Sequence, residues 1–314
     1  MNADGFEATL LLSLDFPESL SLNLGGCTVS IQADSEVLDP IRFQSGHLES
    51  SEAATESLFI LEYGDSMPRL PFKVTETSGS IDGLSFSVLL ELGIICVEFE
   101  ESKNKFVLFR KGRAPTTSDA LRVIYQWVIP YGPVPIHGGS VSWGQRAALI
   151  SSTGGAGKSS LISASVLDGA KTTGDDFGLL TQRDNDYHVW SQFKTFKLSD
   201  MSPTASLMKT DSSLAMIGDK KIYNFSSIAM DPMEACHRVD VILIPKFGTN
   251  PTFSSVPHDQ AMQKIVISSA AMALDKIATI NLISSMSMEI PVFSFELSQD
   301  SQRNAAGLKE FLSK

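Results

Sequence analysis

The sequence predicts an α/β layer protein with a mixed sheet, preceded by a small β-rich (α+β) domain. Residues 1–112 contain short segments in which apolar and polar residues alternate, the pattern of half-buried strands. From residue 135 onward, strand patterns alternate with helical ones, which is typical of α/β folds. The run VDVILIPKF (239–247) is almost continuously apolar, as expected for a strand buried on both faces.

Short strands are expected throughout the β-rich domain. The segments with β character are EATLLLSLDF (7–16), CTVSIQA (27–33), LSFSVLLEL (84–92) and IICVEFEESKNKFVLFRKG (94–112). The last of them predicts a hairpin, because two β-rich arms flank the charged tip ESKNK. The polar stretch QSGHLESSEAATES (44–57) is expected to be a loop or a short exposed helix.

A helix is expected to connect the two domains, within residues 113–134. Thr117 or Ser118 can cap its start, and Pro130 and Gly132 end it. Its apolar face at helical spacing consists of Leu121, Ile124, Tyr125 and Val128. The second domain then covers residues 135–314. Its predicted strands are 135–143, 146–152, 170–182, 187–192, 195–199, 239–247 and 291–298, and its predicted helices are 158–169, 257–278 and 300–314.

Composition limits the classes of function. The 314 residues suffice for about two domains, and 43% of them are hydrophobic. A net charge of −11 without a basic stripe argues against nucleic acid as a partner. Three dispersed cysteines, Cys27, Cys96 and Cys236, predict neither a disulfide framework nor a zinc site. With no basic region at the N-terminus and no apolar run near ~20 residues, we expect a cytoplasmic protein without a membrane partner.

A glycine-rich loop between a strand and a helix predicts a phosphate-binding site. In ALISSTGGAGKSSLISA (148–164), the stretch GGAGKS matches the second half of the pattern G-x-x-x-x-G-K-[ST]. Glycines let backbone N–H groups converge on an anion at a helix N-terminus, where the helix dipole also favours negative charge. Lys158 would reach the β- and γ-phosphates, and the Ser159 hydroxyl would bind Mg²⁺. The residues expected to hold the nucleotide are Gly154, Gly155, Ala156, Gly157, Lys158, Ser159 and Ser160.

Ser152 stands where the pattern has its first glycine. A serine fits there if its φ is negative, because Gly154 and Gly155 can supply the flexible positions. A glycine-rich turn that only joins a strand to a helix is the alternative. The strand before the loop and the amphipathic helix after it favour the phosphate site.

Two adjacent carboxylates, Asp175 and Asp176 in TTGDDFGLL, follow the helix after the loop. They are expected beside the phosphates, where the carboxyl ends of neighbouring strands meet. One could hold Mg²⁺ and the other accept a proton from an attacking hydroxyl. Successive strand residues point to opposite faces, so the two should not share one role. A surface turn is the alternative for the pair, and a structural residue is the alternative for His137 in PIHGGSV before the loop.

The order IHGGSV, GGAGKSS, TTGDDF resembles that of the HPr kinase/phosphorylase and phosphoenolpyruvate carboxykinase-like superfamily. The resemblance implies a P-loop mixed-sheet kinase domain of this type over residues 135–314, and the β domain before it is similar to the leading part of divergent HPr-kinase-related members. It implies that Asp175 is the general base and that Asp176, with Ser159, supports the metal. His137 would lie near this carboxylate pair.

The activity that this resemblance implies is an ATP- and Mg²⁺-dependent kinase that transfers a γ-phosphoryl group to a hydroxyl, on Ser or Thr of a peptide or protein. The segment GLLTQRDNDYHVW lacks the Arg-Gly signature of HPr kinases, so HPr itself is not the expected acceptor. A kinase of a small metabolite, a nucleotide-sensing binding protein and a bare NTPase remain as alternatives. A homo-oligomer is left open.

Three further lysines could reach phosphate or substrate. Lys220 and Lys221 in IGDKKIYNF could do so from a loop, with a solvated turn as the alternative, and Lys246 could do so from the end of a strand. His188 and His237 show no spacing typical of metal ligands.

Overall fold

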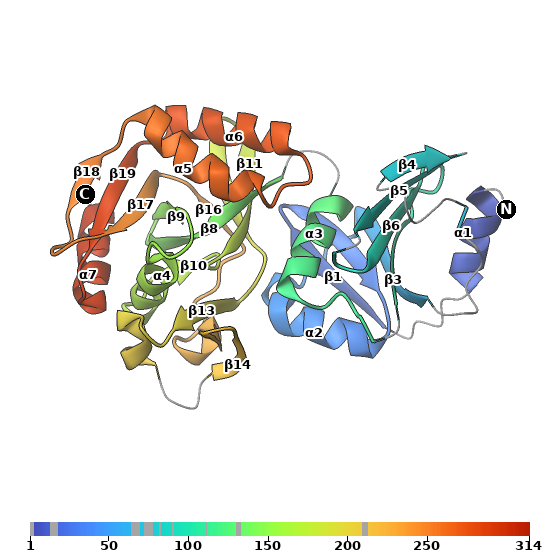
Figure 1. Cartoon of the computed structure of the whole chain (residues 1–314), viewed down its shortest axis with the longest axis horizontal. Helices are drawn as coiled ribbons and strands as arrows, with labels where there is room; N and C mark the ends of the chain where they lie inside the picture. The colour runs from blue at the N-terminus through green and yellow to red at the C-terminus, as the bar shows by residue number, and fades with distance from the viewer. Residues whose placement is uncertain are drawn as a thin grey trace. The chain divides into compact units, whose positions relative to one another are not determined.

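The computed structural model describes residues 3–12, 18–63, 70–71, 78–81, 83–89, 91–110, 112–129, 133–208 and 213–314. The chain forms two compact units, Met1–Pro130 and Tyr131–Lys314 (Figure 1). Each unit contains a mixed sheet, and the second unit also contains a small antiparallel sheet. The mixed α/β class predicted from the sequence is therefore confirmed.

The first unit is built on a seven-stranded sheet in the order β1-β2-β3-β7-β6-β5-β4. In this sheet β3 runs parallel to β2 and β7, and the other neighbours are antiparallel. The strands are β1 (Ser19–Leu24), β2 (Cys27–Gln32), β3 (Glu56–Tyr63), β4 (Ser78–Ile81), β5 (Leu84–Leu89), β6 (Ile94–Phe99) and β7 (Lys105–Arg110). The predicted hairpin is β6 and β7, and the predicted strands at 27–33 and 84–92 contain β2 and β5.

The first segment expected to be a strand begins as a helix. Within residues 7–16, the part up to Leu12 belongs to α1 (Ala3–Leu12), and residues 13–16 lie outside the described part of the chain. Ala3, Phe6 and Leu10 are buried together, at the three- and four-residue spacing of one helical face. A short apolar run does not distinguish helix from strand, and here packing against the core of the sheet favours the helix.

Two more helices complete the first unit, α2 (Ser35–Ser45) and α3 (Ser118–Val128). The sequence predicts α3 correctly: Thr117 accepts a hydrogen bond from the Ala120 N–H, and the predicted apolar face is buried. Helix α2 escapes prediction because Pro40 lies inside it, where proline normally interrupts a helix.

The second unit is built on a nine-stranded sheet in the order β16-β12-β11-β8-β9-β17-β19-β18, with β10 paired to β8. Strands β9, β17 and β19 are parallel, so their carboxyl ends meet at one edge of the sheet. The strands are β8 (Val134–Trp143), β9 (Arg146–Ser151), β10 (Lys171–Thr172), β11 (Phe177–Arg183), β12 (Asp186–Ser191), β16 (Cys236–Arg238), β17 (Val241–Phe247), β18 (Phe253–Ser255) and β19 (Val292–Leu297). The small antiparallel sheet consists of β13 (Thr195–Ser199), β15 (Lys220–Asn224) and β14 (Ser213–Ile217).

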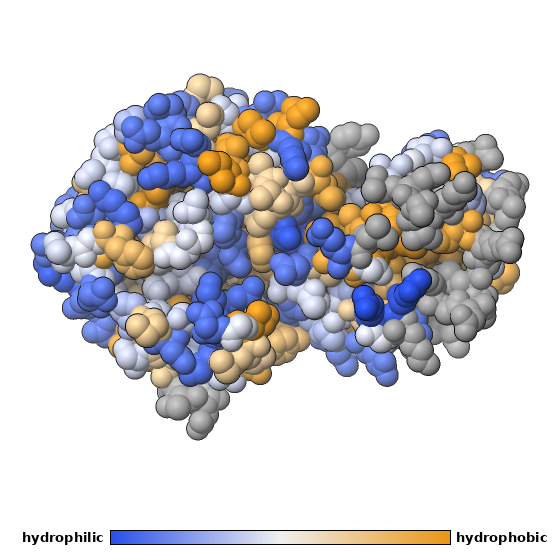
Figure 2. Space-filling model, in the orientation of Figure 1, coloured by the Kyte–Doolittle hydropathy of each residue, from blue (hydrophilic) through white to orange (hydrophobic). Residues whose placement is uncertain are grey.

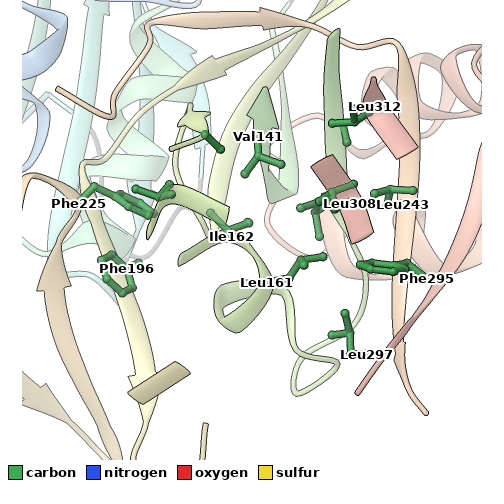
Figure 3. Packing of buried hydrophobic residues seen from close by; sticks show 14 of the residues in the cluster. Val141, Leu161, Ile162, Phe196, Phe225, Leu243, Phe295, Leu297, Leu308 and Leu312 are labelled. Atoms are coloured by element: carbon green, nitrogen blue, oxygen red, sulfur yellow. The ribbon is translucent and has the colours of Figure 1, made fainter. Parts of the chain in front are cut away.

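Helices cover both faces of the nine-stranded sheet (Figure 1). One face carries α4 (Lys158–Leu167) and α7 (Ser301–Leu312), and the other carries α5 (His258–Ala270) and α6 (Lys276–Glu289). Figure 3 shows Leu161 and Ile162 of α4 in the same core as Phe295 of β19. Full burial of such a side chain contributes roughly 1.5–3 kcal/mol, which holds α4 against the sheet.

The prediction of one helix over residues 257–278 is wrong, because the chain breaks between α5 and α6. The Asp275 side chain accepts a hydrogen bond of 2.9 Å from the Ala278 N–H and caps a new helix that continues to Glu289. An aspartate three residues before the capped N–H is a sequence signal for a helix start. The continuous apolar pattern across the break conceals that signal.

Apolar side chains also reach the surface of α5 and α6. Ile267, Ile277 and Met288 are exposed there, and Figure 2 shows apolar patches over these two helices. Among the described residues, no helix is long and apolar enough to cross a membrane.

Candidate functional site

The loop at residues 152–157 joins the carboxyl end of β9 to the first residue of α4. Gly155 and Gly157 have φ of +80° and +93°, which residues with a side chain disfavour. A Cβ at Gly157 would also lie 2.6 Å from Leu297 Cδ1, so that side chain would have to shift. The first N–H groups of a helix have no partner inside the helix, and with the helix dipole they would favour an anion at the start of α4.

Ser152, in place of the first glycine of the pattern, is accommodated without strain. The non-glycine residues with positive φ in the described part of the chain are Lys103, Asp184, Asn185 and Asp231. Ser152 is therefore in the ordinary range, as its fit to the loop requires. Its side chain is 2% exposed, and its carbonyl oxygen faces the loop lysine.

Lys158 folds back into the loop. Its Nζ donates hydrogen bonds to the carbonyl oxygens of Ser152 at 2.9 Å and Thr153 at 3.3 Å. Burial lowers the pKa of this ammonium, the charges of Asp175 and Asp176 oppose the change, and the charge of Lys220 adds to it. The ammonium is thus held inside the loop, from where it can turn to an anion that enters.

Asp175 lies beside Lys158 and Ser159, and its side chain is only 2% exposed. Burial, followed by repulsion from Asp176, raises the pKa of this carboxyl from 3.8 to about 7, although Ser159, Lys158 and the Lys197 amide favour the anion. Its Oδ1 has no hydrogen-bond partner among the described residues. A buried carboxyl that titrates near neutrality can accept or release a proton at physiological pH.

Asp176 has a different environment from its neighbour. Its Oδ1 lies 3.1 Å from His137 Nε2, and its Oδ2 lies 3.6 Å from Lys197 Nζ. Burial works to raise the pKa of Asp176, but the His137 hydrogen bond and then the charge of Lys197 outweigh it, so this pKa is lowered. The two carboxyls therefore have different environments and opposite pKa shifts. They lie between β10 and β11 and not, as predicted, within a single strand over residues 170–182, so strand alternation does not explain the difference.

The glycines after His137 explain why the Asp pair lies at this place. His137 pairs with Phe177 across β8 and β11, which sets Asp176 beside its ring. A Cβ at Gly139 would collide with the carbonyl of Gly174, because the segment before Asp175 crosses directly over β8. The motifs IHGG and TTGDD are thus two sides of one close backbone contact. The sequence shows the glycines of both motifs, but it does not predict that their backbones are in contact.

A buried polar network supports the same segment. His237 Nδ1 lies 2.8 Å from Ser140 Oγ, and Ser140 Oγ lies 2.7 Å from Thr173 Oγ1. His237 Nε2 lies 2.8 Å from Glu234 Oε2. Satisfied buried networks of this kind fix local geometry, so His237, which has no metal spacing in the sequence, has a structural part in holding residue 173 and the chain that follows it.

Lys197 is a site residue that the sequence analysis missed. Its Nζ pairs with Asp176, and its backbone N–H points at Asp175 Oδ2 at 3.5 Å. The Nζ also lies 5.9 Å from the centre of the Phe177 ring. A signal was present in TFKLS: Phe196 and Leu198 are buried in β13, so alternation places Lys197 on the opposite face.

The other predicted lysines have different surroundings. Lys220 begins β15, is exposed and lies close enough to Lys158 to affect its pKa. Lys221 pairs with Asp200 at 2.8 Å, and Lys246 pairs with Glu296 at 3.0 Å. Of the three, Lys220 alone is linked to the loop by the interactions of the described residues.

The donors present fit a Mg²⁺ ion that a nucleotide would bring. The described residues contain no group of three or more His, Cys, Asp or Glu side chains that could hold a metal by themselves. Mg²⁺ in nucleotide sites needs only one or two protein ligands, because phosphates and water supply the rest. The Ser159 hydroxyl and a carboxylate of the Asp pair would offer this chemistry.

Comparisons with known proteins show a distant likeness to solved structures. No protein-family model matches the chain, and no curated protein matches it. Among solved structures, the chain is similar to the HPr(Ser) kinase/phosphatase from Coxiella burnetii, with a TM-score of 0.32 and 13% sequence identity. The similarity covers 56% of this chain and 95% of that chain. A likeness of this size assigns neither a family, nor an activity, nor a substrate.

Proposed function

We propose that the second unit binds ATP at residues 152–160 and transfers its γ-phosphoryl group to a hydroxyl, that of a Ser or Thr in a peptide or protein. The main support is Asp175, a buried carboxyl with a pKa of about 7 and an unpartnered Oδ1, beside Lys158 and Ser159 at the start of a helix. A loop that only joined a strand to a helix would not need a costly buried carboxyl there.

The proposed step is an in-line displacement at phosphorus. The acceptor oxygen forms a bond to the γ-phosphorus while the bond from this phosphorus to the β,γ-bridging oxygen breaks, so that ADP leaves. Asp175 takes the proton of the acceptor hydroxyl. Lys158 exchanges its two carbonyl partners for phosphate oxygens and stabilises their charge. Bound Mg²⁺ would neutralise charge on the β- and γ-phosphate oxygens.

Asp176, in the same proposal, stays ionised and supports the metal side, held by His137 and Lys197. One observation favours a second assignment, in which the two carboxylates exchange roles: Ser159 lies beside Asp175. Asparagine at the metal-side position should raise the Mg²⁺ concentration needed for ATP binding. Asparagine at the base position should leave that requirement unchanged and remove transfer. Mg²⁺ titrations of Asp175→Asn and Asp176→Asn therefore decide between the two assignments.

The proposal is tested with the full chain, γ-labelled ATP and Mg²⁺. The acceptors are a degenerate library of Ser- and Thr-containing peptides and, separately, a set of small alcohols. Label on a peptide supports the proposal, and label on an alcohol points to a kinase of small metabolites. ATP binding without transfer to any acceptor would instead identify a nucleotide sensor. Release of phosphate alone would identify a bare NTPase, and absence of ATP binding would contradict every one of these functions.

Replacement of Lys158 by alanine is expected to weaken ATP binding by about 10- to 100-fold, because each hydrogen bond to a charged group contributes about 1.5–3 kcal/mol. Isothermal titration with ATP and Mg²⁺ measures the change. Lys264→Ala, on the exposed surface of α5, is the matched control and should bind as the wild type does. Unchanged affinity in Lys158→Ala would mean that the loop does not hold the phosphates.

A further inference from the structure

A small pocket of about 20 Å³, which holds about one water molecule, opens next to the glycine-rich loop, on the side away from the Asp pair. It lies at the carboxyl ends of β17 and β19, and its lining includes Gly157, Leu161, Phe247, Leu297 and Asn304. The parallel register sets Phe247 directly opposite Leu297. One wall of this pocket is therefore the last glycine of the loop, and the other walls are the ends of two strands and the start of α7.

Phe247 is an aromatic side chain with no partner for its face. Its side chain is 63% exposed, and no ring contact among the described residues includes it. A Cβ at Gly157 would lie 3.7 Å from Phe247 Cε1, so the ring stands against the loop itself. Leu297 beneath it is 4% exposed. Leu297 is thus already covered, and a flat apolar group lying here would cover the exposed ring of Phe247.

The order of the strands places the polar and the apolar residues on opposite sides of the loop. Strand β9, which leads into the loop, lies between β8 and β17. The Asp pair and His137 belong to the side of β8 and β11, whereas Phe247 and Leu297 belong to the side of β17 and β19. A ligand that crosses the loop would thus meet carboxylates and lysines at one end and an apolar face at the other. A nucleoside triphosphate has this distribution of charge and apolar surface.

We propose that the exposed ring of Phe247, at the rim of this pocket, binds the base of the nucleoside triphosphate by stacking, so that the γ-phosphate points to the Asp pair. This proposal rests on the proposed function. Stacking of a base on an aromatic side chain tolerates any base, because every base has a π-face. The charged groups next to Phe247 in sequence and across the sheet, Lys246 and Glu296, pair with each other at 3.0 Å. The proposed contact with the base therefore depends on the ring and not on these charges.

The polar groups of the pocket predict weak selection among bases. Asn304 Oδ1 accepts hydrogen bonds from the Ser298 N–H and Oγ, both at 2.9 Å, and Asn304 Nδ2 donates to the Ser298 carbonyl at 2.9 Å. These groups are occupied by one another, and hydrogen bonds to a base edge are the main source of strong selection. ATP and GTP are therefore expected to bind within a few-fold of each other.

The test uses isothermal titration of the full chain with ATP, GTP and inorganic tripolyphosphate, each with Mg²⁺. In Phe247→Leu, which keeps the apolar volume and removes the ring, ATP and GTP should bind about 5- to 10-fold more weakly. Tripolyphosphate should bind both proteins equally. Phe247→Tyr keeps an aromatic ring and should therefore retain wild-type nucleotide affinity. Phe43→Leu, at an exposed position of α2, is the control and should bind like the wild type.

Separate results overturn the base site and the phosphate site. Equal ATP affinity in the wild type and Phe247→Leu, or wild-type ATP affinity no higher than that for tripolyphosphate, contradicts the base site and leaves the phosphate site standing. Failure of the wild type to bind both ATP and tripolyphosphate contradicts the proposed function, and the base site with it. A preference of 100-fold or so between ATP and GTP would show selection by edge contacts, against the stacking proposed.

Discussion

Replacement of Asp175 by asparagine is expected to lower γ-phosphoryl transfer by about 10²- to 10⁴-fold, the usual contribution of a general base. Asparagine has the same shape, and its amide oxygen can still accept from the Lys197 N–H that now points at Asp175 Oδ2. ATP should therefore stay bound while the proton of the acceptor hydroxyl has no place to go. Single-turnover transfer and ATP affinity, measured on the same preparation, separate these two effects.

The pH profile gives the prediction a second readout. A base must be deprotonated to act, so kcat/KM for wild-type transfer, measured at low ATP, should rise as the pH increases through about 7, the raised pKa of Asp175 in the free protein. The rise should be lost in Asp175→Asn. Asp184→Asn is the control, because this exposed turn residue has a φ of 50°, which asparagine also tolerates. Wild-type transfer rates in Asp175→Asn at every pH would rule out this carboxyl as the base.

Asp175→Asn should also change the pH dependence of folding stability, which can be measured without any substrate. The pKa of Asp175 is raised from 3.8 to about 7 in the folded protein, so the folded state retains a proton that the unfolded chain releases between these values. Wild-type stability from this group therefore falls as the pH rises from about 4 to about 7, by at most about 4 kcal/mol. Asp175→Asn should gain in melting temperature over the wild type between pH 5 and pH 8.

Local sequence patterns predict the glycine-rich loop and the helix after it because the signals are contiguous. Glycines, Lys158 and the apolar face of α4 follow one another, and each obeys a rule of backbone conformation or periodicity. The helix at residues 3–12 shows the limit of such rules. Its apolar run is too short for the spacing of apolar residues to distinguish a helix from a strand. Burial of Phe6 and Leu10 against the sheet decides between them.

Contacts between distant segments account for what the sequence does not show. Lys197 joins the Asp pair only because β13 passes beside residues 175 and 176. Alternation in TFKLS gives the face on which Lys197 lies, but not this neighbour. The pocket at Phe247 likewise depends on the register between β17 and β19. Lys158 and Lys220 lie close together, and Lys197 lies beside Asp176, so positive charge is concentrated locally in a chain of net charge −11.

Replacement of Gly139 by alanine is expected to remove transfer almost as completely as loss of the base, although residue 139 touches no reacting atom. The added Cβ would collide with the Gly174 carbonyl and crowd the backbone of Asp175. Backbone atoms cannot rotate away as a side chain can, so the segment carrying the Asp pair must lift off β8. Overpacking of this kind costs about 1–3 kcal/mol of stability, and a displacement of ~1 Å in a catalytic group can cost about 10²-fold in rate.

The matched control is Gly307→Ala in helix α7, where a Cβ would make an ordinary contact of 3.4 Å with Pro251 Cβ. Alanine there should preserve transfer and slightly raise stability, since glycine is a poor helix former. For Gly139→Ala, circular dichroism establishes the folded fraction, and single-turnover transfer is then measured per folded molecule. A folded Gly139→Ala protein with wild-type transfer would show that transfer does not depend on the contact between the Asp pair segment and β8. The contact between Gly139 and Gly174 would then serve packing alone.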